Sequence, residues 1–253
     1  MTNDLTHTVN SPATRVAVVS GGSSGIGRAI VTRLHADGWQ VHACGRDAAK
    51  LTSLERELPG VATFICDVAD RHAVRAFARA VARRSPAVHL LVSNAGALRE
   101  LDFTRADLSD VDLTAELRTN LEGAVHLVAE FMPTLRAARG SALLVVSSGY
   151  ALAPATRAPI YSASKAALHS LCKSLRRQLA PLAITVTELL PPVVDTPSVA
   201  HRSGPKMSPD RVAEQALRGA LEGAREVRPG QVGFLPLLLR LWPSLVERIV
   251  GRS

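Results

Sequence analysis

The segment Arg15-Val-Ala-Val-Val-Ser20 runs directly into Gly21-Gly-Ser-Ser-Gly-Ile-Gly27, and residues 28–34 continue with helical spacing of apolar side chains. A short apolar run before a glycine cluster predicts a buried strand, a tight turn and a helix. Glycine allows the chain to turn sharply, and the backbone N–H groups of such a turn can approach an anion at the positive end of the following helix. Taken alone, the pattern also fits an ordinary glycine-rich turn.

The rest of the chain repeats this alternation of short apolar runs and longer amphipathic segments. The short runs predict strands at residues 15–20, 40–45, 61–66, 89–93, 142–147 and 184–189. The amphipathic segments predict helices at residues 26–37, 48–57, 71–84, 108–139 with a break, 161–179 and 209–222. Apolar strands joined by helices are typical of a parallel sheet covered on both faces. We therefore expect an α/β protein with a Rossmann-type, doubly wound parallel sheet flanked by helices.

Length and composition fit one folded domain. The chain has 253 residues, of which 47% are hydrophobic and 21% are charged, and this balance argues against disorder. We expect a flexible tail at residues 1–13, a single domain at residues 14–229, and a leucine-rich helical extension at residues 230–253 that packs on the same domain.

Charge and cysteine content exclude several classes. The net charge of +8 does not indicate nucleic-acid binding, because Arg and Lys are scattered rather than massed in one run. Cys44, Cys66 and Cys172 form no CxxC pair, and no two of the eight histidines have metal-ligand spacing, so we expect neither a disulfide framework nor a metal. The sequence contains no signal peptide pattern and no apolar run of transmembrane length. A cytoplasmic location is expected.

Further motifs follow the turn in order: Cys66-Asp67-Val68, Asn94-Ala-Gly96, Thr119-Asn120, Ser148, Tyr161-x-x-x-Lys165 and Leu190-Pro191. Together with the three-residue gap between the first two glycines of the turn, they resemble the short-chain dehydrogenase/reductase family over about residues 14–200, with Ser20 in place of the usual threonine. The resemblance implies an oxidoreductase that binds a nicotinamide dinucleotide and interconverts a small carbonyl and an alcohol. It also implies a homodimer or homotetramer.

The step from Tyr161 to Lys165 places both side chains on one face of a helix. An ammonium beside a phenol favours the phenolate and lowers the tyrosine pKa, which suits proton exchange near neutral pH. This spacing alone also fits a surface helical pair. The resemblance implies that Tyr161 is the general acid/base and that Lys165 also holds the nicotinamide ribose. It assigns Ser148 to the substrate oxygen and makes Asn120 the fourth catalytic residue. The place of Asn120 in a helical segment indicates either a local kink or a polar role.

The second predicted strand ends at Gly45 and is followed by Arg46 rather than by an acid. An acid at this point bonds the adenosine ribose in dinucleotide folds, whereas a guanidinium can clamp a 2′-phosphate. We therefore favour NADP(H) over NAD(H); Asp47 is either a competing acid or a cap for the next helix. The resemblance implies further cofactor contacts from residues of the turn and of the strand ends: Gly21, Ser23, Ser24, Gly25, Ile26, Gly27, Asp67, Val68, Asn94, Gly96, Tyr161, Lys165, Pro191, Val194 and Thr196. Asp67 also fits an ordinary turn residue.

Two features depart from the family pattern. Pro192 stands where the family has glycine, so the loop loses a backbone donor and becomes stiffer, and this Pro-Pro-x-Val-Asp-Thr variant resembles the DltE-type branch. Residues 237–249 are leucine-rich and basic, which indicates two short helices instead of a closing strand. A missing seventh strand is therefore one expectation. Packing on the core or on a subunit is the favoured role of these helices, and membrane-surface contact and a substrate lid are the alternatives.

These observations favour an NADP(H)-dependent oxidoreductase. A non-catalytic NADP-binding sensor or scaffold is the alternative, against which the complete set of catalytic candidates argues. The substrate is not specified by the sequence, although residues 151–159 suggest an apolar pocket.

Overall fold

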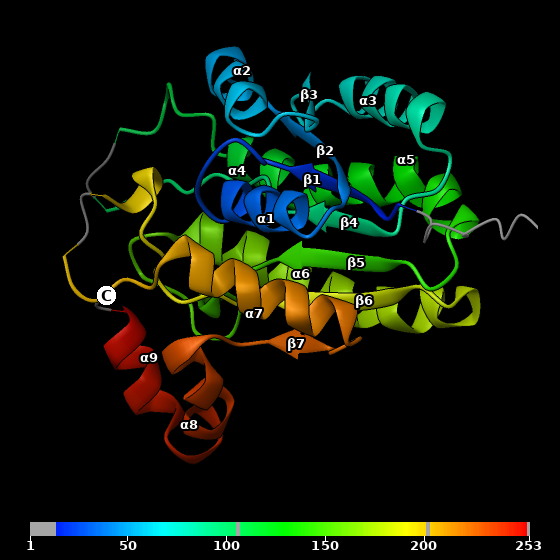
Figure 1. Ribbon diagram of the computed structural model, residues 1–253. Coiled ribbons are helices and arrows are strands. Elements are labelled where there is room, and N and C mark those ends of the chain that lie inside the picture. Colours follow the sequence, from blue (N-terminus) through cyan, green and yellow to red (C-terminus); the bar gives the residue numbers. More distant parts are fainter. Residues whose placement is uncertain (1–13, 105–106, 201–202, 252–253) are drawn as a thin grey trace, which may run out of the picture.

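The structure is a computed structural model that describes residues 14–104, 107–200 and 203–251. Within these residues the chain forms a seven-stranded parallel sheet with strand order β3-β2-β1-β4-β5-β6-β7 (Figure 1). The strands are β1 (Val16–Ser20), β2 (Gln40–Gly45), β3 (Ala62–Ile65), β4 (Leu90–Ser93), β5 (Ala142–Val146), β6 (Thr185–Leu189) and β7 (Glu226–Val227). The order reverses between β1 and β4, which is the topological switch point of this fold. The predicted fold class is confirmed.

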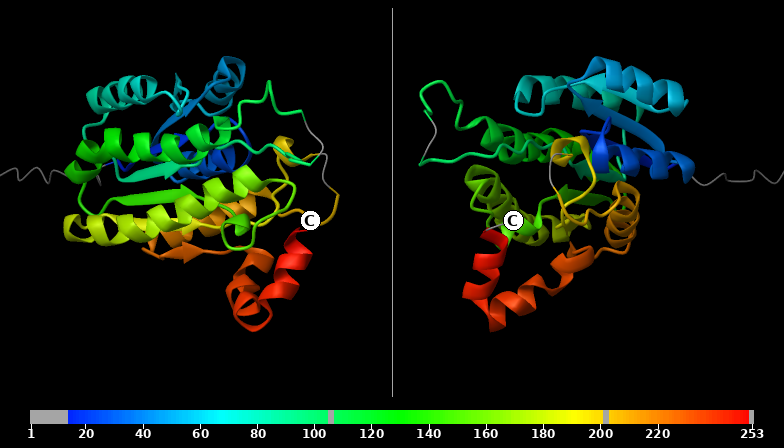
Figure 2. Two further views of the ribbon diagram at one scale, coloured as in Figure 1. Left: turned by 180° about the vertical axis from the view of Figure 1, so that it is seen from behind. Right: turned by 90° about the vertical axis from the view of Figure 1, so that its left-hand side faces the viewer.

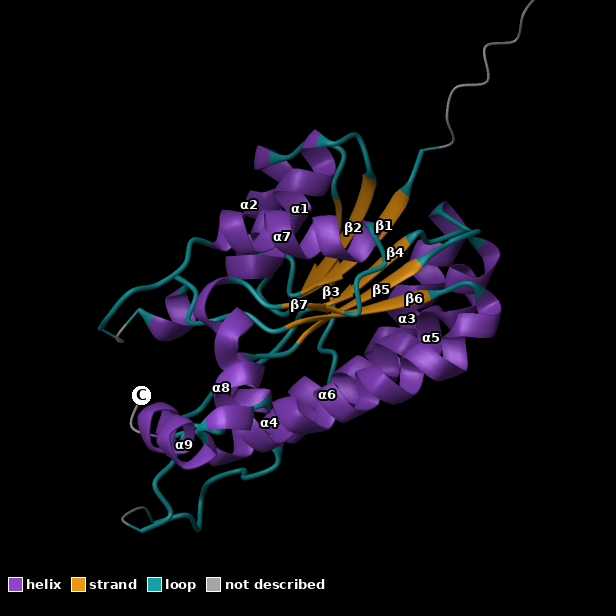
Figure 3. Ribbon diagram, turned by 90° about the horizontal axis from the view of Figure 1, so that it is seen from below, coloured by secondary structure: helices purple, strands orange, loops and turns teal. Residues whose placement is uncertain are grey.

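Helices cover both faces of the sheet. They are α1 (Gly25–Ala36), α2 (Ala48–Glu57), α3 (Arg71–Arg84), α4 (Ala115–Leu117), α5 (Gly123–Ala137), α6 (Pro159–Leu179) and α7 (Pro209–Leu221). Figure 3 shows α1, α2 and α7 on one face and α3, α5 and α6 on the other, and Figure 2 shows the same layers from two further sides. The crossovers between parallel strands therefore leave neither face of the sheet open to solvent.

The burial of β1 shows why its sequence is apolar throughout. Val16 and Val18 face the core beneath α3, α5 and α6, whereas Ala17 and Val19 face the core beneath α1 and α7. Successive side chains of a strand point to opposite faces, so a strand in the middle of a two-sided sheet must be apolar at every position.

The predicted helix at residues 108–139 begins later than expected. Residues 108–114 are not helical, and helical structure starts at Ala115 in α4. The side chains of Asp107 and Asp112 accept hydrogen bonds from the backbone N–H groups of Ser109 (3.0 Å) and Thr114 (3.2 Å). These local bonds compete with the helix. The predicted break is a π-helical turn at Arg118–Glu122 that contains Asn120.

The expectation of a missing seventh strand was wrong. β7 pairs with β6 through backbone bonds from Glu188 N to Arg225 O (3.0 Å) and from Leu190 N to Val227 O (2.8 Å). The strand has two residues and no apolar run, so its extended form depends on pairing with β6 rather than on a local sequence signal.

After β7 the chain forms a 3₁₀ turn (Gly230–Phe234) and two short helices, α8 (Leu235–Leu241) and α9 (Pro243–Gly251). These helices lie beyond β7, toward the end of the sheet at which the strands point (Figure 1). Among the described residues, no helix combines the length and apolarity required to cross a bilayer. The tail predicted at residues 1–13 lies outside the described residues.

Candidate active site

Two adjoining cavities open at the carboxyl ends of the strands, where α/β sheets of this type bind ligands. The first, of about 380 Å³, is lined by the glycine turn, the β2–α2 junction and the segment after β3. The second, of about 610 Å³, extends from the turn past β5 and β6 to α8 and α9. The residues that line both cavities are Gly21, Ser24, Lys50, Ala95 and Gly96. The cavities therefore meet at the glycine turn.

The structure brings most of the predicted site residues to these walls. The predicted residues that line the first cavity are Gly21, Ser23, Ser24, Arg46, Asp67, Val68 and Gly96. Those that line the second are Gly21, Ser24, Gly25, Ile26, Asn94, Gly96, Ser148, Tyr161, Lys165, Pro191, Val194 and Thr196. Of the predicted residues that the structure describes, Gly27 and Asn120 line neither cavity.

The geometry of the turn requires glycine at several positions. Gly21 and Gly25 have φ of +65° and +51°, in the left-handed region that disfavours side chains. A Cβ on Gly25 would lie 2.9 Å from Cγ2 of Thr196, and a Cβ on Gly27 would lie 2.2 Å from the carbonyl oxygen of Gly21. The backbone itself therefore forms the surface of the turn, as binding of a pyrophosphate requires.

Ser20 and Asn94 join the turn to the end of β4. The buried Ser20 hydroxyl donates to Val92 O (3.2 Å) and accepts from the backbone N–H groups of Asn94 (3.0 Å) and Ala95 (3.1 Å). Asn94 Nδ2 donates in return to the carbonyl oxygens of Ser20 (2.9 Å) and Gly21 (3.2 Å). A hydroxyl at position 20 thus fixes the relative position of two strand ends, which explains why serine can replace threonine there.

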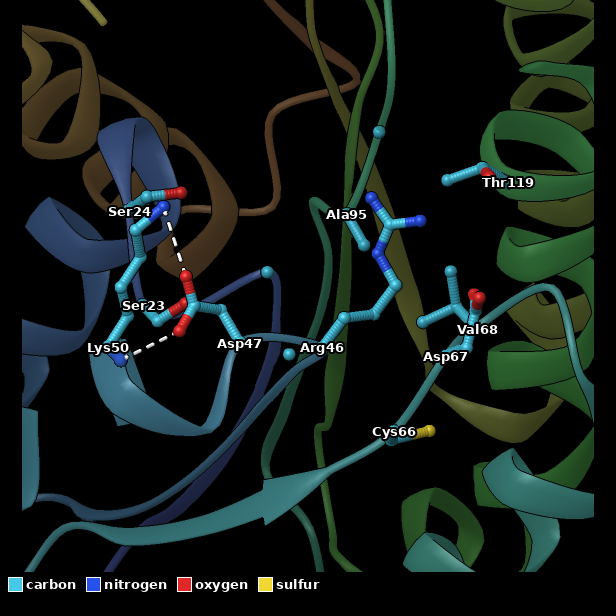
Figure 4. Close-up of a pocket in the computed structure, with 13 residues that line it drawn as sticks. Ser23, Ser24, Arg46, Asp47, Lys50, Cys66, Asp67, Val68, Ala95 and Thr119 are labelled. Carbon is cyan, nitrogen blue, oxygen red and sulfur yellow. Dashed lines mark hydrogen bonds and ion pairs between the residues drawn. The ribbon is translucent and has the colours of Figure 1, made fainter. Parts of the chain in front are cut away.

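Arg46 and Asp47 differ in direction, as Figure 4 shows. Both residues line the first cavity; the Arg46 side chain extends into it, whereas the carboxylate of Asp47 is directed at the first turn of α2. Asp47 Oδ1 accepts from the backbone N–H of Lys50 (3.1 Å), and its Oδ2 lies 3.3 Å from Lys50 Nζ. The hydrogen bond from Lys50 N is the main cause of a lowered Asp47 pKa. Asp47 therefore caps α2, and its charge is paired with Lys50.

Asp67 and Val68 border the first cavity opposite the glycine turn (Figure 4). Asp67 Oδ1 accepts from the N–H of Ala69 (3.0 Å), so this side chain also shapes the turn after β3. Val68 packs against Gly123, where an added Cβ would lie 2.6 Å from Cγ2 of Val68. The first cavity is consequently bordered by the Arg46 side chain and by the loop after β3, which contains Asp67 and Val68.

Lys165 is buried at the floor of the second cavity, with an exposed fraction of 3%. Its Nζ donates to Val146 O (3.0 Å) and lies 5.4 Å from the centroid of the Tyr161 ring. Burial lowers the pKa of Lys165 to about 8, and the negative charge of Glu188 opposes this shift. The group is thus charged at neutral pH close to the Tyr161 ring.

Ser148 and Ser147 follow β5 and have different partners. Ser148 Oγ accepts from the backbone N–H of Tyr150 (3.2 Å), as the cap of the 3₁₀ turn Gly149–Ala151. Because this bond uses the oxygen as an acceptor, the Ser148 proton can be donated to a ligand in the cavity. Ser147 Oγ donates instead to the backbone carbonyl of Lys165 (3.3 Å).

Asn120 connects the loop after β4 with α6. Its Oδ1 accepts from Ala97 N (2.8 Å), and its Nδ2 donates to Ala97 O (2.9 Å) and to Ser164 Oγ (2.9 Å). A Cβ built on Gly96 would lie 3.2 Å from Asn120 Oδ1 and 3.5 Å from Lys165 Nζ. Asn120 and Lys165 therefore approach the same small residue, and a side chain at Gly96 would crowd the Asn120 amide oxygen.

The sequence did not single out several residues that line the cavities. Lys50 lines both cavities. Its position in the first turn of α2, four residues after Arg46, was a sequence signal that could have identified it as a site residue. Tyr150 lines the second cavity, with its ring 6.3 Å from that of Tyr161 at an interplanar angle of 87°. Its place two residues after Ser148 was the corresponding signal.

The apolar wall of the second cavity does not come from residues 151–159, as the sequence suggested. Among the described residues, none of this segment lines either cavity. The reason is that Ala153, Ala155 and Ala158 are turned into the protein and buried. The wall is formed instead by the loop after β6, which includes the predicted Pro192, and by the C-terminal helices.

An ionic cluster joins α6 to strands β6 and β7. His169 Nδ1 is 2.7 Å from Glu188 Oε2, and Arg176 is 3.8 Å from the same oxygen. Glu226 pairs with Arg228, and the potential ligand atoms of His169, Glu188 and Glu226 lie within 4.8 Å of one another. Two arginines already balance the two carboxylates, so we assign no metal to this cluster.

Comparison with known proteins is consistent with this geometry. The family model for short chain dehydrogenases matches residues 15–206. The chain belongs to the short-chain dehydrogenase/reductase family. The uncharacterized oxidoreductase DltE of Bacillus subtilis is 36% identical to this dehydrogenase over 217 residues, covering 83% of the chain and 86% of DltE. The resemblance to the DltE-type branch is thereby confirmed.

Two other relatives extend the comparison. A putative ketoacyl reductase of granaticin polyketide synthesis from Streptomyces violaceoruber is 35% identical to the dehydrogenase over 203 residues, covering 78% of this chain and 74% of its own. A short chain dehydrogenase from Burkholderia cenocepacia, solved in complex with NADP, has a TM-score of 0.83 and 27% identity, and the match covers 95% of this chain and 98% of that one. The family membership makes this protein an oxidoreductase.

Proposed function

We propose that the protein is an NADP(H)-dependent oxidoreductase that interconverts a carbonyl and an alcohol, with Tyr161 as the general acid/base. The observation that carries this proposal is the convergence of Tyr161, Lys165 and Ser148 on one cavity that joins the glycine turn. A ligand bound along the turn would extend directly to these three side chains.

The cofactor site is proposed to span both cavities. The turn has no room for side chains at Gly25 and Gly27, where added Cβ atoms would collide with neighbouring atoms. Its backbone N–H groups at the amino end of α1 are therefore suited to binding a pyrophosphate. Arg46 in the first cavity suits a 2′-phosphate. Asp47 is held at the start of α2 by the backbone N–H and the ammonium of Lys50, and this role as a helix cap supports NADP(H) over NAD(H). The relative from Burkholderia cenocepacia, solved with NADP, supports the same preference.

When bound, the reduced nicotinamide supplies a hydride to the carbonyl carbon. Ser148 Oγ donates a hydrogen bond to the substrate oxygen, and this bond strengthens as negative charge develops there. Tyr161 Oη donates its proton to the same oxygen, and the positive charge of Lys165 stabilises the phenolate that remains. In the reverse direction the phenolate accepts the alcohol proton.

The burial of Lys165 argues for catalysis rather than cofactor sensing. A lysine with a lowered pKa is held in a position that disfavours its charge, and such groups concentrate at functional sites. A protein that only binds NADP would need the glycine turn, Arg46 and the lysine that holds the ribose, but not the Ser148 and Tyr161 hydroxyls in the same cavity as that lysine. Cytoplasmic location, homodimeric or homotetrameric assembly and membrane-surface contact of the tail stay predictions.

Titration of the protein with NADPH and NADH, followed by a carbonyl-reduction assay, tests the proposal. We expect tighter binding of NADPH than of NADH, and oxidation of NADPH that depends on an added ketone or aldehyde. Tighter binding of NADH would contradict the cofactor assignment. NADPH binding without turnover across ketones, aldehydes and acyl-carrier substrates would favour the sensor.

A further inference from the structure

The C-terminal extension forms one wall of the second cavity. Val232 comes from the 3₁₀ turn, Leu235 and Leu238 come from α8, and Val246 and Ile249 come from α9. All five side chains are apolar. They lie in the same cavity as Tyr161, although α9 is more than 80 residues further along the chain. The helices at the lower left of Figure 1 thus border the site where the proposed reaction takes place.

A second part of the lining is also mainly apolar. It is built by the loop after β6, through Pro192, Val193, Pro197 and Val199, all of which line the cavity. The hydroxyl-bearing side chains Ser148, Tyr150 and Tyr161 gather where this space meets β5 and α6. Away from these hydroxyls most of the lining is apolar, with Thr196 and Gln231 as polar exceptions.

Charged groups are scarce on these walls. Among the described residues that line the second cavity, the charged side chains are Lys50 and Lys165. Lys165 donates to Val146 O, and Lys50 pairs with Asp47 on the side shared with the first cavity. The part of the cavity beside α8 and α9 thus offers no described cation to a carboxylate or phosphate and no described anion to an amine. Burial of such a group there would remove its hydration without replacement.

The rim of the cavity, where it opens to solvent, is also apolar. Leu238 and Ile249 line the cavity and are at the same time 38% and 61% exposed. A ligand longer than the enclosed space would pass over apolar side chains as it leaves the cavity. The volume of about 610 Å³ lies within the range of about 300 to 1,000 Å³ that is usual for small-molecule sites.

We propose that the substrate is an uncharged, predominantly apolar ketone or aldehyde, whose hydrocarbon part lies between the loop after β6 and helices α8 and α9. This inference rests on the proposed function, because the carbonyl oxygen must reach Ser148 and Tyr161. The carbon of that carbonyl accepts the hydride and its oxygen accepts the tyrosine proton, so the hydrocarbon part takes no part in the chemistry. Its burial supplies the binding energy.

The first test compares methyl ketones of increasing chain length in the NADPH-oxidation assay. Each additional buried methylene is expected to raise kcat/KM by up to about fourfold until the chain leaves the cavity. A keto acid of the same length, with its carboxylate at the far end, is expected to be a much poorer substrate. Equal kcat/KM values along the series, or a preference for the keto acid, would overturn the inference.

The second test places a charge on the proposed wall. Leu238→Asp is expected to lower kcat/KM for a ten-carbon ketone by at least about tenfold and to change that for a four-carbon ketone by less than about threefold. Leu237→Asp is the matched control, because Leu237 neighbours Leu238 in α8, is 58% exposed and is not among the described lining residues. Equal losses in the two variants, or equal losses for both ketones, would contradict the placement of the chain.

A third measurement separates failure of this inference from failure of the proposed function. Calorimetric titration of the ten-carbon ketone into NADPH-loaded Tyr161→Phe protein reports binding without turnover. We expect binding that Leu238→Asp weakens in this background and Leu237→Asp leaves unchanged. Ketone binding in a wild-type protein that reduces no carbonyl would support the apolar site and contradict the proposed function. Absence of ketone binding, in a protein that does reduce small polar carbonyls, would overturn the inference alone.

Discussion

Lys165 Nζ donates a 3.0 Å hydrogen bond to the backbone carbonyl of Val146, the last residue of β5. Ser148 follows two residues later, so the hydrogen bond connects Lys165 of α6 to the strand that leads into Ser148. The two catalytic candidates therefore do not depend on separate loops for their relative position. The same burial that fixes Lys165 also lowers its pKa.

Lys165 should give the protein a measurable dependence of stability on pH. Its pKa is about 8 in the folded protein and 10.5 in the reference state, so the unfolded chain binds more protons between these values. Unfolding free energy should therefore rise with pH in this window. We expect the unfolding free energy of the wild type to rise by roughly 1 to 2 kcal/mol relative to that of Lys165→Met from about pH 8 to about pH 9.5. Urea unfolding of both proteins checks this, and a constant difference would contradict the lowered pKa.

Arg46 should determine the preference for NADPH. Arg46→Ala is expected to weaken NADPH binding about 10- to 100-fold, because a hydrogen-bonded guanidinium–phosphate pair contributes roughly 1.5–3 kcal/mol. Binding of NADH, which has no 2′-phosphate, should change by less than about threefold. Fluorescence titration with both cofactors measures this. Arg56→Ala is the control, because Arg56 lies on α2 but is not among the described lining residues. Parallel losses for both cofactors would contradict the assignment.

The Ser20 hydroxyl should be required at the switch point of the sheet. Ser20→Ala leaves the N–H groups of Asn94 and Ala95 and the carbonyl of Val92 without this partner. Loss of about 1–3 kcal/mol of unfolding free energy is expected from buried groups left unpaired. Ser20→Thr keeps the hydroxyl and should retain most of the stability. Thermal unfolding of the two variants distinguishes them, and equal losses would indicate that the hydroxyl is not the important part of the side chain.

Much of the fold could be predicted because the signals are local. The apolar run of β1 and the glycines at 21, 25 and 27 specify a strand, a turn and a helix without reference to distant parts of the chain. Asn120 is unfavourable inside a regular helix, and a π-helical turn occurs at that residue.

The remainder depends on partners that the sequence does not identify. β7 is extended because β6 offers it backbone groups. Asp107 and Asp112 favour local hydrogen bonds over the helix that the apolar spacing predicts. The alanines of residues 151–159 are apolar, but sequence alone does not tell whether an apolar side chain faces a cavity or the core. For the same reason, the contribution of Leu235, Leu238 and Val246 to the cavity was missed.

The chain contains two tyrosines, Tyr150 and Tyr161, and we propose that Tyr161 is the proton donor. Both line the second cavity, with ring centroids 6.3 Å apart, but Lys165 Nζ lies over the ring of Tyr161. The most direct measurement is the rate of ketone reduction by Tyr161→Phe and Tyr150→Phe, each saturated with NADPH. We expect Tyr161→Phe to lose at least about a hundredfold in kcat, in line with general acid catalysis, with NADPH binding preserved and Tyr150→Phe within about tenfold of wild type. Full turnover in Tyr161→Phe, or the larger loss in Tyr150→Phe, would contradict this proposal.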